Sequence, residues 1–448
     1  MKSLWIKNPL AIFAEDADGG IVVIDGKISE LVRSDDVPAT DAVFDASRHV
    51  VLPGLINTHH HFYQNLTRAY RPALNKGLFE WLRALYPVWA RLTPEMLSVA
   101  TELALTELLV SGCTTSTDHH YVFPGNLENG IDIQVDAARK VGLRVLLTRG
   151  SMDLSVMDGG LPPPSVVQDA DTILADSDRL VGKYHQDDDG AFVQIALAPC
   201  SPFSVTREVM VGSADLARKR GILLHTHLAE TVDENEFCQR KLKMRPLDYL
   251  EECGWLQERV WLAHGIHFTD DELTRMAAAD VGVSSCPHSN MALGSGICPA
   301  CDMDQRGIAV GIGVDGSASN DASNMIEEVR QMLMSQRLRY GANAVSHLDA
   351  IRWATEGSAR CIGRTDIGKI EVGRRADLAL FALDELRHSG HHDPLAALIL
   401  CGHHRADFVM IEGEWRVENG AVSGRDLHDL MARHARASRE LANSASLY

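Results

Sequence analysis

The segment Val51-Leu52-Pro53-Gly54-Leu55-Ile56-Asn57-Thr58-His59-His60-His61 decides between two α/β folds. It is typical of a buried strand that ends in polar side chains. An open doubly wound sheet carries a glycine-rich phosphate-binding turn after its first strand, and no such turn follows Asn57. His59 and His61 are two positions apart, so they point into the same space, while His60 points elsewhere. The segment therefore favours the first strand of a barrel, with its chemistry at the carboxyl end.

Seven further apolar runs follow the first one at regular intervals. They lie at residues 113–117, 143–147, 192–197, 221–225, 260–264, 281–284 and 308–313. The stretches between them have helical patterns, for example over residues 95–109 and 326–339. Eight strand-and-helix repeats over about 300 residues predict a (β/α)8 TIM barrel.

The two ends of the chain have a different pattern, of short strands. Residues 21–24 and 27–32 flank the turn pair Asp25-Gly26, and the C-terminal part has comparable runs at 376–381, 407–411 and 415–417. Each end alone has few strands with which to bury a core. We therefore expect a small composite β-sandwich domain of residues 1–52 and 366–448, with a C-terminal helical tail, around a barrel domain of residues 53–365. Two unrelated terminal sheets are the alternative.

The charge balance of the chain restricts its partners. The 448 residues include 43 Lys plus Arg and 61 Asp plus Glu, so 43 − 61 leaves a formal charge of −18. Nucleic-acid binding depends on cations that neutralise phosphates, and anionic membranes attract basic surfaces. We expect no nucleic-acid partner, no membrane partner, and a small molecule as the substrate.

The cysteines and the N-terminus predict a cytoplasmic protein. Nine cysteines, an odd number, are scattered from Cys113 to Cys401, which favours free thiols over a disulfide framework. The first twenty residues lack the basic start and unbroken apolar core of a signal peptide. The sequence has no run of about 18 apolar residues, so we expect no transmembrane helix.

A set of histidines and carboxylates follows the predicted strands. A single histidine at a strand end is usually structural, and an aspartate before a glycine is common in turns. Here several such residues fall at the same end of separate strands, where barrel enzymes build their sites. Three histidines and a carboxylate suit a divalent transition metal with one position left for water. The residues are His59, His61, His225, His227, Glu230, His264 and Asp315.

Several of these segments resemble the amidohydrolase superfamily, and in particular its aminohydrolase branch. They are residues 53–61, 225–231, 286–291 (Cys-Pro-His-Ser-Asn-Met), 314–317 and 368–378. The resemblance covers nearly the whole chain. It implies that His59, His61, His227 and Asp315 hold a metal, and that Glu230, His264 and Asp315 are catalytic.

The resemblance also implies one metal ion. Members with two metals carry a carboxylated lysine after the fourth strand, and residues 196–201, Ala-Leu-Ala-Pro-Cys-Ser, contain no lysine. We expect zinc, with iron as the alternative metal. We expect His225 to support the neighbouring residues of the site rather than to bind the metal. The expected reaction is hydrolytic deamination, in which metal-activated water attacks, Asp315 accepts its proton, His264 orients it and Glu230 protonates the base.

Three polar residues at other strand ends are candidates for binding the substrate. Gln64, Tyr121 and Cys200, together with residues 7–13, resemble the 8-oxoguanine deaminase group of that branch. This resemblance implies deamination of a free purine base, 8-oxoguanine to urate, in purine catabolism. Guanine, isocytosine, an adenosine-type nucleoside or a hydroxytriazine are alternative substrates, and an inactive scaffold of the same fold is the alternative from another class.

Trp81 and one pair of cysteines each have two interpretations. Trp81 has either a role against the ligand or a place on an apolar helix face. The pair Cys298 and Cys301 has no second cysteine pair at zinc-ribbon spacing, which favours a structural role. We also expect the protein to form a homo-oligomer.

Overall fold

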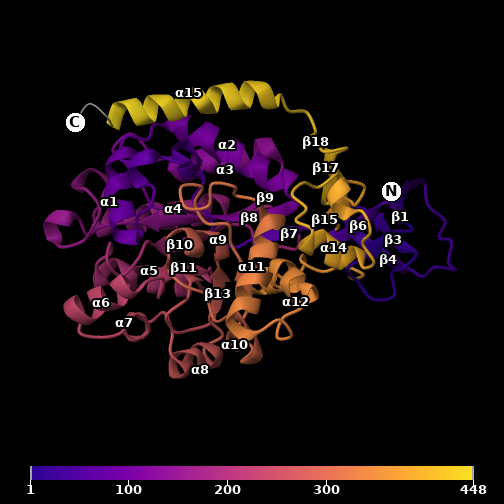
Figure 1. Ribbon diagram of the computed structural model, residues 1–448. Helices are drawn as coiled ribbons and strands as arrows, with labels where there is room; N and C mark the ends of the chain where they lie inside the picture. The colour runs from indigo at the N-terminus through magenta and orange to yellow at the C-terminus, as the bar shows by residue number, and fades with distance from the viewer. Residues whose placement is uncertain (1–2, 446–448) are drawn as a thin grey trace.

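The computed structural model describes residues 3–445. Eight parallel strands form a closed barrel in the order β10-β11-β12-β13-β14-β7-β8-β9, which confirms the predicted fold class. Figure 1 shows the barrel strands at the centre of the molecule, surrounded by helices. The barrel strands are β7 (Leu55–Asn57), β8 (Cys113–His120), β9 (Arg144–Ser151), β10 (Val193–Pro199), β11 (Leu224–Leu228), β12 (Val260–His264), β13 (Gly282–Ser285) and β14 (Val310–Ile312).

The helices lie in the connections between strands and after the last strand. Within residues 3–445, no helix is both long and apolar enough to cross a membrane. The α-helices are α1 (Leu78–Trp89), α2 (Pro94–Val110), α3 (Gly130–Val141), α4 (Ala170–Tyr184), α5 (Arg207–Arg220), α6 (Val232–Lys241), α7 (Pro246–Glu252), α8 (Asp270–Ala278), α9 (Pro287–Ala292), α10 (Ala300–Gln305), α11 (Met325–Tyr340), α12 (His347–Arg352), α13 (Ser358–Cys361), α14 (Pro394–Leu400) and α15 (Leu427–Ala445).

The predicted first barrel strand is divided between two sheets. The prediction of a single strand over residues 51–56 was therefore wrong. Its first part belongs to β6 (His49–Pro53), which pairs with β15 outside the barrel, and only β7 joins the barrel. The chain changes sheets at Gly54, where an added Cβ would lie 2.1 Å from the Thr114 Oγ1. Because both sheets bury this run, its hydrophobic pattern does not show where one strand ends and the next begins.

Strands from both ends of the chain meet beside the barrel (Figure 1). β15 pairs antiparallel with β6, and residues of both sheets share one buried apolar cluster that includes Ile21, Val51 and Leu378. The predicted boundaries at residues 52/53 and 365/366 stay a prediction. One sheet consists of β4 (Lys27–Val32), β3 (Gly20–Ile24), β1 (Ser3–Lys7) and β5 (Ala42–Asp45), and the other of β18 (Ala421–Val422), β17 (Glu414–Glu418), β16 (Phe408–Ile411), β15 (Leu378–Ala382), β6 and β2 (Ala11–Ile12).

The C-terminal helix α15 supports the segment that follows the first barrel strand. It lies across α2 (Figure 1) and contacts the short 3-10 helix η1 (Phe62–Thr67). The His434 Nε2 donates a hydrogen bond to the Asn65 Oδ1 at 2.9 Å, and the Ser438 hydroxyl donates to the Leu66 carbonyl at 2.7 Å. α15 therefore holds in place the segment that carries Gln64.

A buried arginine joins the barrel to the C-terminal strands. Arg144, at the start of β9, is 0% exposed and forms an ion pair with Asp377 at 3.1 Å and another with Glu412. Its guanidinium also donates to the carbonyls of Gly190 and Ala191 at 2.7 and 2.8 Å. The guanidinium thus binds acceptors in the loop before β10 and in the C-terminal part of the chain, which connects the two parts of the fold.

We expect Arg144→Met to destabilise the protein by about 3 kcal/mol, because it leaves the buried Asp377 carboxylate without its partner. Denaturant-induced unfolding of the full chain measures the change. Arg48→Met is the matched control, since Arg48 and Asp384 form an exposed pair at 3.3 Å and such pairs contribute about 0–1 kcal/mol. Equal stability of the two variants would contradict a structural role for Arg144.

Candidate active site

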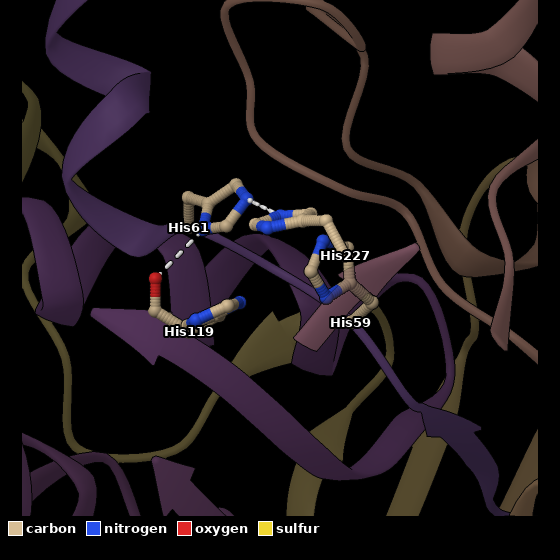
Figure 2. A group of neighbouring side chains, drawn as sticks. All are labelled: His59, His61, His119 and His227. Carbon is tan, nitrogen blue, oxygen red and sulfur yellow. Dashed lines mark hydrogen bonds between the residues drawn. The ribbon is translucent and has the colours of Figure 1, made fainter. Parts of the chain in front are cut away.

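Three histidine rings converge at the carboxyl end of the barrel (Figure 2). His59 and His61 follow β7, and His227 lies in β11. The Nε2 atoms of His61 and His227 are 3.1 Å apart, and all three rings are at least 92% buried. Residues distant in the sequence thus direct nitrogen atoms into one small space.

The surrounding hydrogen bonds define the tautomer of each ring. The Nδ1 of His61 faces the His119 carbonyl at 2.7 Å, and the Nδ1 of His227 faces the Cys200 carbonyl at 2.6 Å. A carbonyl oxygen only accepts, so both Nδ1 atoms carry the hydrogen and both Nε2 atoms carry lone pairs. Burial lowers the pKa of His61 to about 4 and that of His227 well below its usual value, so both rings are neutral at pH 7.

His225 orients the third ring. Its Nδ1 donates to the Trp261 carbonyl at 2.8 Å, so its Nε2 accepts from the Nδ1 of His59, also at 2.8 Å. The Nε2 of His59 is therefore left with a lone pair, and it has no hydrogen-bond partner within residues 3–445. His225 supports a neighbouring ring and does not point into the cluster of lone pairs.

Asp315 completes a donor set that fits a divalent metal. Its Oδ1 lies 3.4 Å from the Nε2 of His59 and 3.3 Å from the Nε2 of His61. Its other oxygen accepts from the Ser289 hydroxyl at 2.6 Å, which fixes the carboxylate. Three imidazole lone pairs and a carboxylate at these separations repel one another unless a cation lies between them, and zinc accepts this set of ligands.

Two further polar side chains lie beside this donor set. The Glu230 Oε2 is 3.6 Å from the His264 Nε2, and both side chains are almost completely buried. Burial, followed by the negative charge of Asp315, raises the pKa of Glu230 well above its usual range. Glu230 can therefore hold a proton near neutral pH, as a group that protonates a substrate must.

The backbone of the site is strained at three positions. Ala229, His264 and Asp315 have φ angles of 54°, 71° and 63°, in the left-handed region that residues other than glycine rarely adopt. Such strain persists only where surrounding contacts maintain it, and it is concentrated at functional sites. Two of the three residues are predicted catalytic residues, and the third directly precedes Glu230.

A single cavity brings the predicted substrate-binding residues to the predicted metal ligands. Gln64, Tyr121 and Cys200 line it, and an apolar wall from α1 covers it. Trp81 belongs to this wall and also donates from its Nε1 to the Ala318 carbonyl at 3.2 Å, so it lines the cavity and packs against a loop. The complete lining consists of His61, Gln64, Leu78, Trp81, Leu82, Tyr86, Tyr121, Cys200, Phe203, His227, Glu230, His264, Leu293, Asp315 and Ser319.

The chain resembles known proteins in sequence and in fold. Residues 50–425 match the model of the amidohydrolase family. The chain belongs to the amidohydrolase family. It is 59% identical to the 8-oxoguanine deaminase of Pseudomonas aeruginosa over 98% of this chain and 99% of that protein.

Solved structures of other family members share the fold. The atrazine chlorohydrolase of Arthrobacter aurescens, complexed with zinc, matches with a TM-score of 0.90 and 30% identity, over 98% of this chain and 100% of that one. An adenosine deaminase from Xanthomonas campestris with bound zinc matches with a TM-score of 0.85 and 28% identity, over 94% and 93% of the two chains. Both of these structures contain zinc, the metal that the donor set of this amidohydrolase also suits.

Sequence reasoning missed several residues of the amidohydrolase site. His119 stacks on His227 with 4.6 Å between ring centroids, and its carbonyl orients His61. The buried carboxylate of Glu234 accepts from the backbone N–H groups of Ala229 and Glu230 at 3.0 and 2.9 Å. Tyr86 belongs to α1, which had no motif to indicate a functional role.

Two cysteines that invited a metal interpretation have other neighbours. The Cys298 thiol lies 3.9 Å from the Met303 sulfur, and the Cys301 thiol lies 3.7 Å from the Gln336 Oε1. Among the residues that the structure describes, the candidate metal-binding groups include neither cysteine. Both thiols are buried, as expected of small apolar residues.

Proposed function

We propose that this amidohydrolase deaminates the free base 8-oxoguanine to urate and ammonia. The observation that carries the proposal is one cavity in which Gln64, Tyr121 and Cys200 face the histidine cluster and Glu230. The identity of 59% with an 8-oxoguanine deaminase over nearly the whole of both chains supports the choice of base. The negative charge of −18 supports a free base rather than a base within DNA.

His59, His61, His227 and Asp315 are the residues that would hold the metal. Zinc, when bound, lowers the pKa of a coordinated water to about 7 and so supplies the nucleophile at neutral pH. The atom balance of the reaction requires one water for each ammonia released. We assign a single zinc ion because β10 contains no lysine, and iron is the alternative metal.

The side chains around the metal site move the protons. Water forms a C–O bond to C2 of the base, and Asp315 accepts the proton that the water gives up. Glu230, protonated because it is buried, donates to the ring nitrogen next to C2, and His264 orients the attacking water. The C–N bond to the amino group then breaks, and the proton from Asp315 leaves with the nitrogen as ammonia. The hydroxyl proton at C2 returns to Glu230 as the C2 carbonyl of urate forms.

Gln64, Tyr121 and Cys200 would bind the carbonyl and ring-nitrogen edges of the base. The Gln64 amide has neither its oxygen nor its nitrogen in a hydrogen bond within residues 3–445, although both atoms are buried. An amide that can both donate and accept suits a purine edge, which alternates between the two. The proposal also includes a cytoplasmic location, a homo-oligomer and a place in purine catabolism.

We expect the purified protein to release ammonia from 8-oxoguanine faster than from guanine, cytosine or adenosine. The measurement is kcat/KM for ammonia release over a panel that also contains isocytosine, methylthioadenosine and a hydroxytriazine. Zinc content is determined on the same preparation. A clear preference for any other member of the panel would reassign the substrate. Absence of bound metal together with absence of ammonia release would favour an inactive scaffold.

A further inference from the structure

Tyr86 has a buried hydroxyl group without a hydrogen-bond partner in the candidate active site. Its side chain is 1% exposed and lines the cavity from α1. Among the described residues the hydroxyl oxygen has no hydrogen bond of good geometry, and the Cys200 thiol lies against it only as a weak partner. Buried polar groups are nearly always hydrogen-bonded, and leaving one unpaired reduces stability. An unpaired phenol in the cavity that the predicted metal ligands also line therefore points to a ligand atom that completes it.

Neighbouring residues place Tyr86 on one side of the barrel mouth. Burial raises the pKa of Tyr86, and the Cys200 thiol beside the phenol raises it further, so the hydroxyl keeps its hydrogen and can donate. The Cys200 Sγ is 3.9 Å from the Nδ1 of His227. Nδ1 faces away from the lone-pair cluster, so Cys200 and Tyr86 lie outward from the metal site.

Gln64 lies on the opposite side of the mouth. A Cβ added to Gly316 would meet the Gln64 Oε1 at 1.9 Å, so this amide rests against the residue after Asp315, beyond β14. Cys200 follows β10, and β10 and β14 are four strands apart in a barrel of eight. The two sets of polar groups thus face each other across the cavity, as two ends of a flat bicyclic ligand require.

The chemistry of the base decides which of its atoms faces Tyr86. This step rests on the proposed function, in which C2 of 8-oxoguanine is the carbon attacked at the metal site. In a purine, C8 lies at the far end of the long axis from C2. In 8-oxoguanine C8 carries a carbonyl oxygen, which accepts a hydrogen bond, whereas in guanine it carries only hydrogen.

We propose that the Tyr86 hydroxyl donates a hydrogen bond to the C8 carbonyl oxygen of 8-oxoguanine and so discriminates this base from guanine. With guanine bound, the hydroxyl keeps no partner. With 8-oxoguanine bound, the phenol and the carbonyl satisfy each other. Tyr86 is then a specificity-determining residue that lies outside the strand-end motifs.

The test is Tyr86→Phe, which removes one oxygen and keeps the ring. We expect kcat/KM for 8-oxoguanine to fall about 10- to 100-fold, since the variant leaves a buried carbonyl unpaired, and kcat/KM for guanine to stay within about twofold. The ratio of the two values is the readout, because a general loss of folding lowers both. Tyr249→Phe is the matched control, since Tyr249 is also buried, at 3% exposed, but lies outside the cavity.

A second measurement needs no variant. Urate and xanthine differ at C8, where urate carries the carbonyl and xanthine does not. We expect urate to inhibit the wild-type protein at a concentration at least about tenfold lower than xanthine does. This comparison also replaces the substrate ratio if guanine is turned over too slowly to measure, and it stands if Tyr86→Phe fails to fold.

The outcomes separate this inference from the proposed function. Wild-type protein that leaves 8-oxoguanine unchanged would overturn both. A different result would overturn the role of Tyr86 alone. In that case the wild-type protein converts 8-oxoguanine to urate, and Tyr86→Phe has the same ratio of kcat/KM for 8-oxoguanine to kcat/KM for guanine as the wild type. Equal inhibition by urate and xanthine would do the same.

Discussion

Glu230→Gln is expected to retain its zinc and lose nearly all activity. The side chain lies 3.6 Å from the Nε2 of His264 and is not part of the converging donor set, so its replacement leaves the metal ligands intact. Glutamine has almost the same shape but carries no transferable proton. General acid–base groups typically contribute about 10²- to 10⁴-fold, so we expect kcat for 8-oxoguanine to fall by about 10³-fold.

Zinc content and kcat are measured on the same preparation of this variant. Glu208→Gln is the matched control, because Glu208 is exposed on α5, away from the cavity. The control retains both zinc and activity. Near-normal turnover by Glu230→Gln would exclude Glu230 as the proton donor, and loss of zinc would mean that its carboxylate belongs to the metal site.

His61→Ala is expected to lose both the metal and the activity. The Nε2 of His61 lies 3.1 Å from that of His227 and 3.3 Å from the Asp315 Oδ1, so it contributes to the centre of the donor set. Loss of one of four ligands weakens zinc binding by more than the 10- to 100-fold typical of supporting residues. We expect less than about a tenth of the wild-type zinc content after dialysis against a weak chelator.

The same variant tests whether the metal also stabilises the fold. A metal that binds only the folded protein raises the free energy of unfolding by mass action, so excess chelator lowers the melting temperature of the wild type. We expect chelator to leave the melting temperature of His61→Ala unchanged. His347→Ala, which removes a histidine near Asp393 outside the cavity, behaves like the wild type in both measurements. Full zinc retention by His61→Ala would contradict its role as a ligand.

The sequence predicted most of the fold because local patterns and turns agree with it. Asp25 and Gly26 have φ angles of 50° and 77°, the left-handed pair that a tight hairpin needs, and β3 and β4 lie on either side of them. The predicted run 260–264 coincides with β12. One exception was the run 51–56, where two sheets bury adjacent halves of one apolar segment. Another was the run 221–225, which begins at the glycine that ends α5 and overlaps β11 only at Leu224 and His225.

Residue types and spacing also indicated which side chains gather in the site. His59 and His61 are two residues apart, and the chain places both rings against His227, as the spacing predicts. The roles of these residues stay predictions. Spacing did not reveal His119, because its contribution to His61 is a backbone carbonyl, a group that every residue has.

The sequence by itself determined the barrel, the family and the set of side chains at the strand ends, because periodicity and short motifs act over a few residues. Only the tertiary structure decided the tautomers and the pKa values of these groups. The tautomers of the rings depend on carbonyls from other strands, and the pKa of Glu230 depends on burial beside Asp315. The unpaired hydroxyl of Tyr86 likewise depends on the tertiary structure, which places α1 against the cavity. Hydrogen-bond partners are neighbours in space and need not be neighbours in the chain.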